Sequence, residues 1–179
     1  MKAFKLMIIL GEDADSDPTF DSEVKVEGAF YAWSYDEVKA LFDANKDKFK
    51  NLKGLSPFDI YCTHFDIKKL GNVEPASDPH GHLTKQNILI VRGSLAKTAE
   101  KYSLSEDQIT ELLDVGNKIL NETREMRPRP HLDYKILTAW NGLLLVGIAK
   151  IACIKNNPLR DEYIEVGKKL VEFIQTYLF

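Results

Sequence analysis

The segment from Asp133 to Lys155 constrains the fold most strongly, because apolar residues occupy nearly every side of the helix that it predicts. A helix of this kind must be covered on more than one side. Asn141, Gly142 and Lys150 interrupt its apolar run, whereas a membrane span needs about 20 consecutive apolar residues. We therefore predict a buried core helix in a soluble protein that has no membrane partner.

The chain offers this helix one immediate partner, an amphipathic segment at 158–178. Asn157 is suited to cap that segment and Pro158 to its first position, so the two helices form an αα-hairpin with a tight turn. One partner leaves part of the first helix uncovered, as in stacked hairpins that need further neighbours. We expect an exposed apolar face, so the isolated chain should self-associate, bind a hydrophobic dye, or need its missing portions to be soluble. Its residues are drawn from Leu143, Leu144, Val146, Ile148 and Ile151.

Two further helices have well-defined starts. Ser34 with Glu37, and Ser105 with Gln108, match the capping box, in which the two side chains bond to each other's backbone N–H groups. The second of these helices ends before Pro128, because proline lacks the N–H that a helix interior requires. Both halves of the chain therefore contribute helices.

Two segments rich in β-forming residues predict a small sheet, namely 28–33 (GAFYAW) and 86–92 (QNILIVR). We expect them to pair antiparallel. The segment 51–79 between them carries repeated glycines and prolines and is predicted to be rich in loops. The predicted fold class is therefore mainly α with a small antiparallel sheet.

Charge and cysteine content exclude several classes of protein. Lys and Arg total 24 against 27 Asp and Glu, and a net charge of −3 argues against a dedicated nucleic-acid binder. Cys62 and Cys153 form no Cys-x-x-Cys motif and are expected to be ordinary thiols of a reducing, cytoplasmic compartment. The apolar run within residues 1–10 is too short for a signal peptide, so we expect a short strand or a poorly integrated start.

Two sets of residues could be taken for metal sites, and neither fits. Asp13, Asp15 and Asp17 match the first ligand positions of an EF-hand, but Pro18 and Val24 stand where glycine and a bidentate glutamate are required. A second set departs from the common spacing of zinc ligands: Cys62, His64, His80 and His82. We predict no bound metal and no cofactor.

The candidate catalytic residues lie in the acidic opening and before the apolar helix. In an extended chain Asp13 and Asp15 point to the same side, and paired carboxylates suit acid–base or glycosidic chemistry. The stiff segment 127–133 contains His131 and Asp133, and two interpretations of it stay open. It is either a rigid connector in which Asp133 caps the helix, or a catalytic segment at the mouth of a helical cavity.

The candidate substrate-binding residues are Trp140, Asn141 and Arg129. The aromatic face of Trp140 suits a sugar ring. Common nucleotide-binding, serine-hydrolase and zinc-protease motifs are absent from the sequence, so no other chemistry is indicated.

Several sequence blocks taken in order are more informative than any one of them. They are EDADS at 12–16, EGAFYAW at 27–33, GNVEP at 71–75, QNILIVR at 86–92, RPRPHLD at 127–133 and LTAWNG at 137–142. In this order they resemble the spermatogenesis-associated protein 20 family over about residues 12–179.

That family joins an amino-terminal thioredoxin-like domain to a six-hairpin, glycosidase-like α/α toroid related to sugar epimerases. The resemblance implies that 94–179 form the first helices of an incomplete toroid. It implies that 12–93 precede them as an acidic loop, two strands and one helix, and it leaves 1–11 unmatched. The missing partners would be the thioredoxin-like domain and the later helical hairpins.

Two hypotheses about function follow from the resemblance. In the first, the parent protein acts on a sugar or glycoside, with Asp13, Asp15, His131 and Asp133 as acid–base groups. In the second, the parent is a non-enzymatic, redox-associated binding or scaffolding protein. Under either hypothesis we expect no turnover by the isolated chain, because a catalytic set needs a rigid supporting shell.

Overall fold

The computed structural model describes residues 11–50 and 52–178, which form two compact units. The mixed unit comprises Ala14–His131. The hairpin unit comprises the chain from Leu132 onward together with its start up to Asp13. The segment 1–10, predicted to form a short strand or a poorly integrated start, lies outside the described residues.

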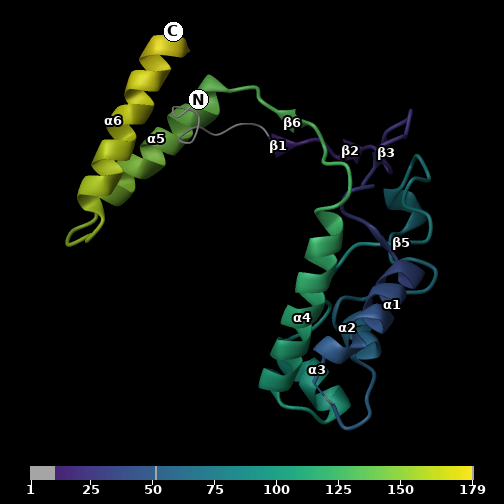
Figure 1. Ribbon diagram of the computed structural model, residues 1–179. Helices are drawn as coiled ribbons and strands as arrows, with labels where there is room; N and C mark the ends of the chain where they lie inside the picture. Colours follow the sequence, from purple (N-terminus) through teal and green to yellow (C-terminus); the bar gives the residue numbers. More distant parts are fainter. Residues whose placement is uncertain (1–10, 51, 179) are drawn as a thin grey trace. The chain divides into compact units, whose positions relative to one another are not determined.

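Helices α1 to α4 build the mixed unit, as Figure 1 shows. They are α1 Tyr35–Ala44, α2 Pro57–His64, α3 Leu95–Tyr102 and α4 Glu106–Arg124. Short 3₁₀ turns occur at η2 Lys46–Lys48 and η3 Pro75–Ser77. Helix α4 contacts each of the other three helices, so it is the element around which the unit packs.

Serine hydroxyls cap all four helices of the mixed unit. Each hydroxyl accepts the backbone N–H of the residue three positions later. At α4 the predicted capping box is complete, because Gln108 Oε1 also accepts the Ser105 N–H at 3.0 Å. At α1 the structure shows the Ser34 half of the box, while the Glu37 carboxylate accepts a bond from Arg127.

Helix α2 lies within the segment predicted to be rich in loops, so that prediction is wrong for Pro57–His64. Pro57 occupies the first helical position, and Ser56 Oγ accepts the Asp59 N–H at 3.2 Å. Three apolar side chains of α2 are buried, Phe58, Ile60 and Tyr61, and His64 at its end is buried as well. The region preceding α3 therefore contains two α-helices instead of the single one predicted.

The predicted antiparallel pairing of 28–33 with 86–92 is confirmed, but it is short. It joins β4 (Trp33–Ser34) to β5 (Gln86–Asn87). The residues before β4 form a turn, because Tyr31 and Ala32 both donate their N–H groups to the Gly28 carbonyl. Gly28 has a φ of +74°, which few other residues adopt without strain. A second antiparallel pair joins β2 (Asp15–Ser16) to β3 (Val26–Glu27).

One hydrophobic core holds the four helices of the mixed unit together. Trp33, Val38, Ile60, Tyr61 and Ile109 are almost fully buried in it. Burial of each such side chain contributes about 1.5–3 kcal/mol. This core holds the backbone around Trp33 in place, and the turn before Trp33 accepts the hydrogen bonds of Arg127.

The hairpin unit contains α5 (Thr138–Ala152), α6 (Arg160–Tyr177) and a strand pair of β1 (Gly11–Glu12) with β6 (Leu132–Asp133). The predicted hairpin is confirmed, since α5 and α6 pack together around Ile148, Leu170 and Ile174. The observed class of the described chain is mainly α with small antiparallel sheets, as predicted. The toroid stays a prediction.

The predicted ends of the hairpin helices need correction. Asp133 does not cap α5, because its backbone pairs in β6 and its Oδ1 accepts the Lys135 N–H at 3.1 Å. Helix α5 begins at Thr138 and ends at Ala152. Helix α6 begins at Arg160, since Asn157 Oδ1 accepts the Leu159 N–H and so holds the connection in a turn.

The expected exposed face of α5 is present in part. Leu143, Val146 and Ile151 are 71%, 51% and 39% exposed. Leu144 is half-buried against the small core and Ile148 is buried. Among the described residues, no helix is both long and apolar enough to cross a membrane.

Candidate functional site

The residues predicted to form the site are divided between the two units. The hairpin unit contains Asp13, Asp133, Trp140 and Asn141, and the mixed unit contains Asp15, Arg129 and His131. Within the described ranges, no cluster of three or more His, Cys, Asp and Glu side chains is arranged to hold a metal ion.

In the hairpin unit two predicted carboxylates come close to one lysine. The β1–β6 pairing sets Gly11 opposite Asp133, which places Asp13 just beyond the strand pair. Asp133 Oδ2 lies 2.9 Å from Lys135 Nζ. The hydrogen bond from Lys135 to Asp133 raises the pKa of Lys135, and the nearby charge of Asp13 raises it further. Lys135 thus forms an ion pair with Asp133 beside the β1–β6 strand pair.

Trp140 and Asn141 lie in the first turn of α5 and behave differently. Asn141 is fully buried, and its Nδ2 donates to the Leu137 carbonyl at 3.0 Å. That bond stabilises the start of the helix. Trp140 is 42% exposed and offers an aromatic surface. Of the two, Trp140 is the one placed to meet a ligand.

In the mixed unit the three predicted residues are mostly exposed. Asp15 lies in β2, opposite Glu27 of β3. Arg129 forms an ion pair with Glu125, one turn before it. His131 follows the proline-rich segment and is exposed. These positions leave all three side chains accessible to solvent.

Arg127, at the start of the segment 127–133, forms four hydrogen bonds to other parts of the mixed unit and was not among the predicted site residues. Its Nη1 donates to the carbonyls of Ala29, Phe30 and Ala32 at 3.2, 2.9 and 2.8 Å. Its Nη2 donates to Glu37 Oε1 at 2.8 Å. The guanidinium also lies 3.9 Å from the centre of the Trp33 ring. Arg127 thus ties the end of α4 to the turn before β4.

A signal for this role was present in the sequence. Arg127 follows a long helix and precedes Pro128, so its position relative to α4 is rigid. A planar guanidinium also suits several acceptors at once, and a turn offers carbonyls that no strand partner uses. Which carbonyls it reaches depends on contacts more than 90 residues apart, and the sequence does not reveal those.

A cleft of about 270 Å³ lies in the mixed unit beside this turn. Its polar lining includes Glu27, Glu37, His82, Gln86 and Arg127. Small and apolar residues provide the rest of its surface: Pro18, Val26, Gly28, Ala29, Ala32 and Leu83. None of the seven predicted site residues lines it.

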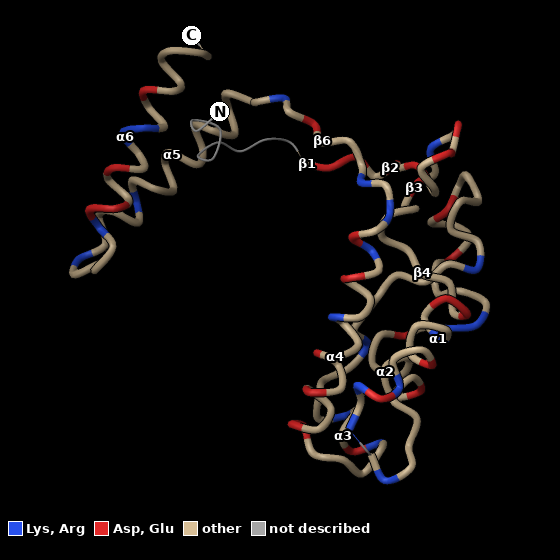
Figure 2. The backbone as a smooth tube through the Cα atoms, in the orientation of Figure 1, with Lys and Arg blue, Asp and Glu red and all other residues tan. Residues whose placement is uncertain are grey.

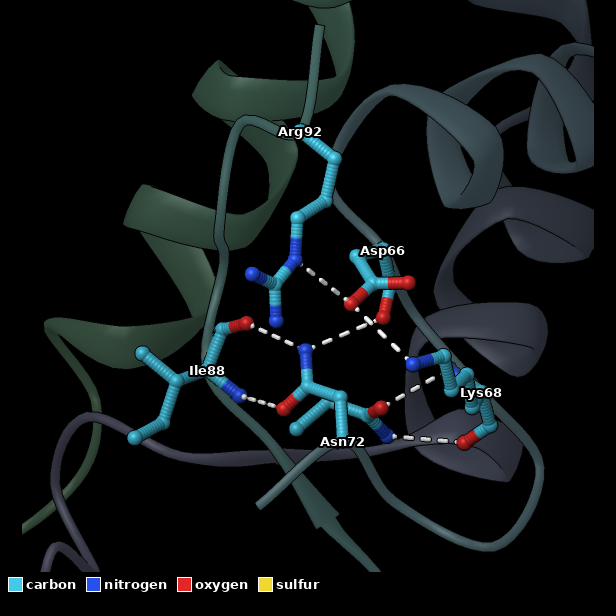
Figure 3. A network of polar contacts seen from close by, with 6 residues as sticks. Asp66, Lys68, Asn72, Ile88 and Arg92 are labelled. Carbon is cyan, nitrogen blue, oxygen red and sulfur yellow. Dashed lines mark hydrogen bonds and ion pairs between the residues drawn. The ribbon is translucent and has the colours of Figure 1, made fainter. Parts of the chain in front are cut away.

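A network of side-chain amides closes the loop between α2 and β5, as Figure 3 shows. Asn72 Nδ2 donates to the Ile88 carbonyl at 2.7 Å, and the Ile88 N–H donates to Asn72 Oδ1 at 2.9 Å. The buried Asn87 bonds in the same way to both backbone groups of Lys68. These asparagines replace strand partners, so the blocks GNVEP and QNILIVR have a structural role here.

Burial makes two other reactive side chains of the mixed unit less reactive. It raises the pKa of the Cys62 thiol to about 12, which suppresses the nucleophilic thiolate. It lowers the pKa of His64, whose Nδ1 lies 3.0 Å from Thr98 Oγ1. Both side chains are packed into the core of the mixed unit.

Comparison with known proteins places the chain within a class of larger proteins. No protein-family profile matches it. The chain is 34% identical to spermatogenesis-associated protein 20 of Homo sapiens over 168 residues, which is 94% of the chain and 21% of the human protein. It is 38% identical to the Mus musculus protein of the same name over 77% of the chain and 17% of that protein. It is 36% identical to uncharacterized protein B0495.5 of Caenorhabditis elegans over 93% of the chain and 22% of that protein.

The chain is therefore a mainly helical segment related to part of a longer protein, and it spans about a fifth of the length of these relatives. It belongs to the spermatogenesis-associated protein 20 family. The resemblance found in the sequence blocks is thus confirmed at the level of the family.

Proposed function

We propose that the longer protein containing this segment acts on a sugar or glycoside, and that Asp13 and Asp133 serve as acid–base groups. The observation that carries the proposal is the β1–β6 pairing, which brings the segment of Asp13 next to that of Asp133 although the two come from distant parts of the sequence. Glycosidic chemistry commonly uses two carboxylates that flank the reacting bond. The glycosidase-like toroid implied by the family resemblance agrees with this chemistry.

The neighbouring groups support the same chemistry. Lys135 keeps a positive charge beside the acids and can donate a hydrogen bond to a substrate hydroxyl. The exposed ring of Trp140 suits the apolar face of a sugar. Asp15 and His131 are proposed as further acid–base groups and Arg129 as a further binding residue, while the buried Asn141 would act only by stabilising the helix start that carries Trp140. The isolated chain is expected to be inactive, because the remaining support belongs to the parent protein.

The test uses the full-length protein and a panel of monosaccharides and aryl glycosides. We expect Asp13→Asn and Asp133→Asn each to lower turnover by about 10²-fold or more, the loss typical of a missing acid–base group. The matched control is Asp21→Asn, because Asp21 is an exposed aspartate eight residues after Asp13. Unchanged turnover in both variants, at unchanged melting temperature, would contradict the proposal.

The exposed apolar face of α5 favours a second candidate, a non-enzymatic binding or scaffolding role. Leu143 and Val146 are more than half exposed, and such surfaces mark interaction sites. Under this candidate no glycoside of the panel binds the full-length protein. The double variant Leu143→Gln, Val146→Gln would instead change its oligomeric state, measured by light scattering.

A cytoplasmic location is part of the proposal. Cys62 and Cys153 are both free thiols, as expected in a reducing compartment. Imaging of a fluorescent fusion of the full-length protein tests this, and a signal confined to an oxidising compartment would contradict it.

A further inference from the structure

The cleft beside the Arg127 turn is a second candidate ligand site, separate from the β1–β6 carboxylates. It lies wholly within the mixed unit. Its volume of about 270 Å³ is just below the range of about 300–1,000 Å³ that is usual for small-molecule pockets. A ligand of this cleft would therefore be about the size of a single ring.

His82 is held in one tautomer at the edge of this cleft. Its Nδ1 lies 3.2 Å from the backbone nitrogen of Glu27, which is the donor of the hydrogen bond. An N–H group can donate only to a ring nitrogen that carries a lone pair, so the proton of neutral His82 is on Nε2. The hydrogen bond from the β3 backbone thus fixes the tautomer of the His82 ring and leaves Nε2–H as a donor for a ligand.

The acidic groups of the cleft have different roles. Glu37 is already engaged, since its Oε1 accepts a bond from Arg127. The four bonds of Arg127 go to three carbonyls and this carboxylate, so its guanidinium is a structural group. Glu27 also lines the cleft, and its carboxylate can accept hydrogen bonds from a ligand.

The remaining lining narrows the chemistry of the ligand. Gln86 can both donate and accept through its amide. Ala29, Ala32 and Leu83 provide small apolar surfaces. Within the described residues, Glu27, Glu37 and His82 are not arranged as a metal-binding group. A mixture of acceptors, donors and small apolar surface suits a ring that carries several hydroxyl groups.

We propose that this cleft binds a single polyhydroxylated ring of monosaccharide size, with Glu27 accepting from its hydroxyls and His82 Nε2 donating to one. The choice of ligand class rests on the proposed carbohydrate function. The site itself does not depend on Asp13 or Asp133. Glu37 and Arg127 are positioning residues that keep the turn 28–32 in place.

The experiment measures binding of methyl glucoside, methyl galactoside and methyl mannoside to the full-length protein by saturation-transfer NMR and calorimetry. We expect His82→Gln and Glu27→Gln each to weaken binding about tenfold or more, since each leaves a hydroxyl unpaired. The control is His80→Gln, because His80 lies near His82, with ring centres 5.7 Å apart, but does not line the cleft. Long-range ¹H–¹⁵N spectra should report a proton on His82 Nε2 that shifts when a glycoside binds.

The outcomes separate this inference from the proposed function. Loss of binding in His82→Gln and Glu27→Gln, with normal binding in Asp133→Asn, supports the cleft. Unchanged binding in both cleft variants, at unchanged melting temperature, overturns it, even if Asp133→Asn loses turnover. Absence of binding of all three glycosides to the wild type also overturns it.

Discussion

The two units use apolar residues in opposite ways. In the mixed unit, α4 buries Ile109, Leu112 and Ile119 against the other helices. In the hairpin unit, α5 is the more apolar helix, and Figure 2 shows almost no charge along it, yet Leu143 and Val146 stay exposed. Apolar content alone therefore does not determine burial. What matters is the number of partners that an element has.

Arg127 provides the sharpest test of the stability of the mixed unit. We expect Arg127→Ala to lower the free energy of unfolding by about 3 kcal/mol or more, because it removes charged bonds to carbonyls and leaves Glu37 unpaired. The matched control is Arg129→Ala, which removes an exposed ion pair and should cost about 0–1 kcal/mol. Urea unfolding followed by circular dichroism measures both, and equal losses would show that Arg127 is no special anchor.

Alanine substitutions at two helical glycines, Gly116 and Gly147, test how tightly each unit is packed. A Cβ on Gly116 would lie 2.6 Å from the Tyr61 ring, so Gly116→Ala should destabilise the mixed unit by about 1–3 kcal/mol. A Cβ on Gly147 of α5 would have no atom within 4 Å, so Gly147→Ala should stabilise the hairpin by up to about 1 kcal/mol. Thermal unfolding that shifts in the same direction for both variants would contradict this difference.

A fall in pH should lower the free energy of unfolding of the mixed unit, because His64 must then be protonated. Burial lowers the pKa of His64 in the folded chain, so folding favours its neutral form. The resulting stability is fully present above the ordinary histidine pKa of about 6.5, and it is lost as the pH falls through the lower folded value. His64→Gln should therefore flatten the pH dependence of unfolding in this range. Parallel profiles for wild type and His64→Gln would disprove the effect.

The smallest expected effect on stability concerns the exposed face of α5. Leu143→Gln combined with Val146→Gln should reduce binding of a hydrophobic dye by the isolated chain, because both side chains are more than half exposed. The unfolding free energy should change by less than about 0.5 kcal/mol, as is usual for surface substitutions. The control Leu170→Ala, a fully buried change in α6, should raise dye binding. Dye binding that the double variant leaves unchanged would show that the dye binds elsewhere.

Sequence patterns predicted those parts of the fold that depend on neighbours in the chain. The capping box at Ser105 and the hairpin of α5 with α6 follow from local spacing, and both are present. Helix α2 differs from the prediction because the glycines and prolines of 51–79 indicate loops, whereas Pro57 after Ser56 also suits the first position of a helix. The late start of α5 depends on the pairing of β6 with β1, which local spacing cannot show.

The site was harder to predict than the fold, for a related reason. Of the two arginines in the proline-rich segment, the sequence analysis selected Arg129 as a binding residue. The structure pairs Arg129 with the adjacent Glu125 and gives the long-range contacts to Arg127. His82 was considered only as a metal ligand, because its bond to the Glu27 backbone joins residues 55 positions apart. The proposed roles of Asp13 and Asp133 await the experiments above.

The position of Arg127 also sets an order of events when the chain is made. The carbonyls that it binds lie 95 to 98 residues earlier, and Glu37 lies 90 residues earlier. The turn 28–32 and α1 therefore leave the ribosome well before Arg127 does, and water must occupy those carbonyls until it arrives. Contacts between such distant residues form late in folding, because the chain between them must first be ordered. A chain that lacks residue 127 therefore lacks the four hydrogen bonds that hold this turn and Glu37 to the end of α4.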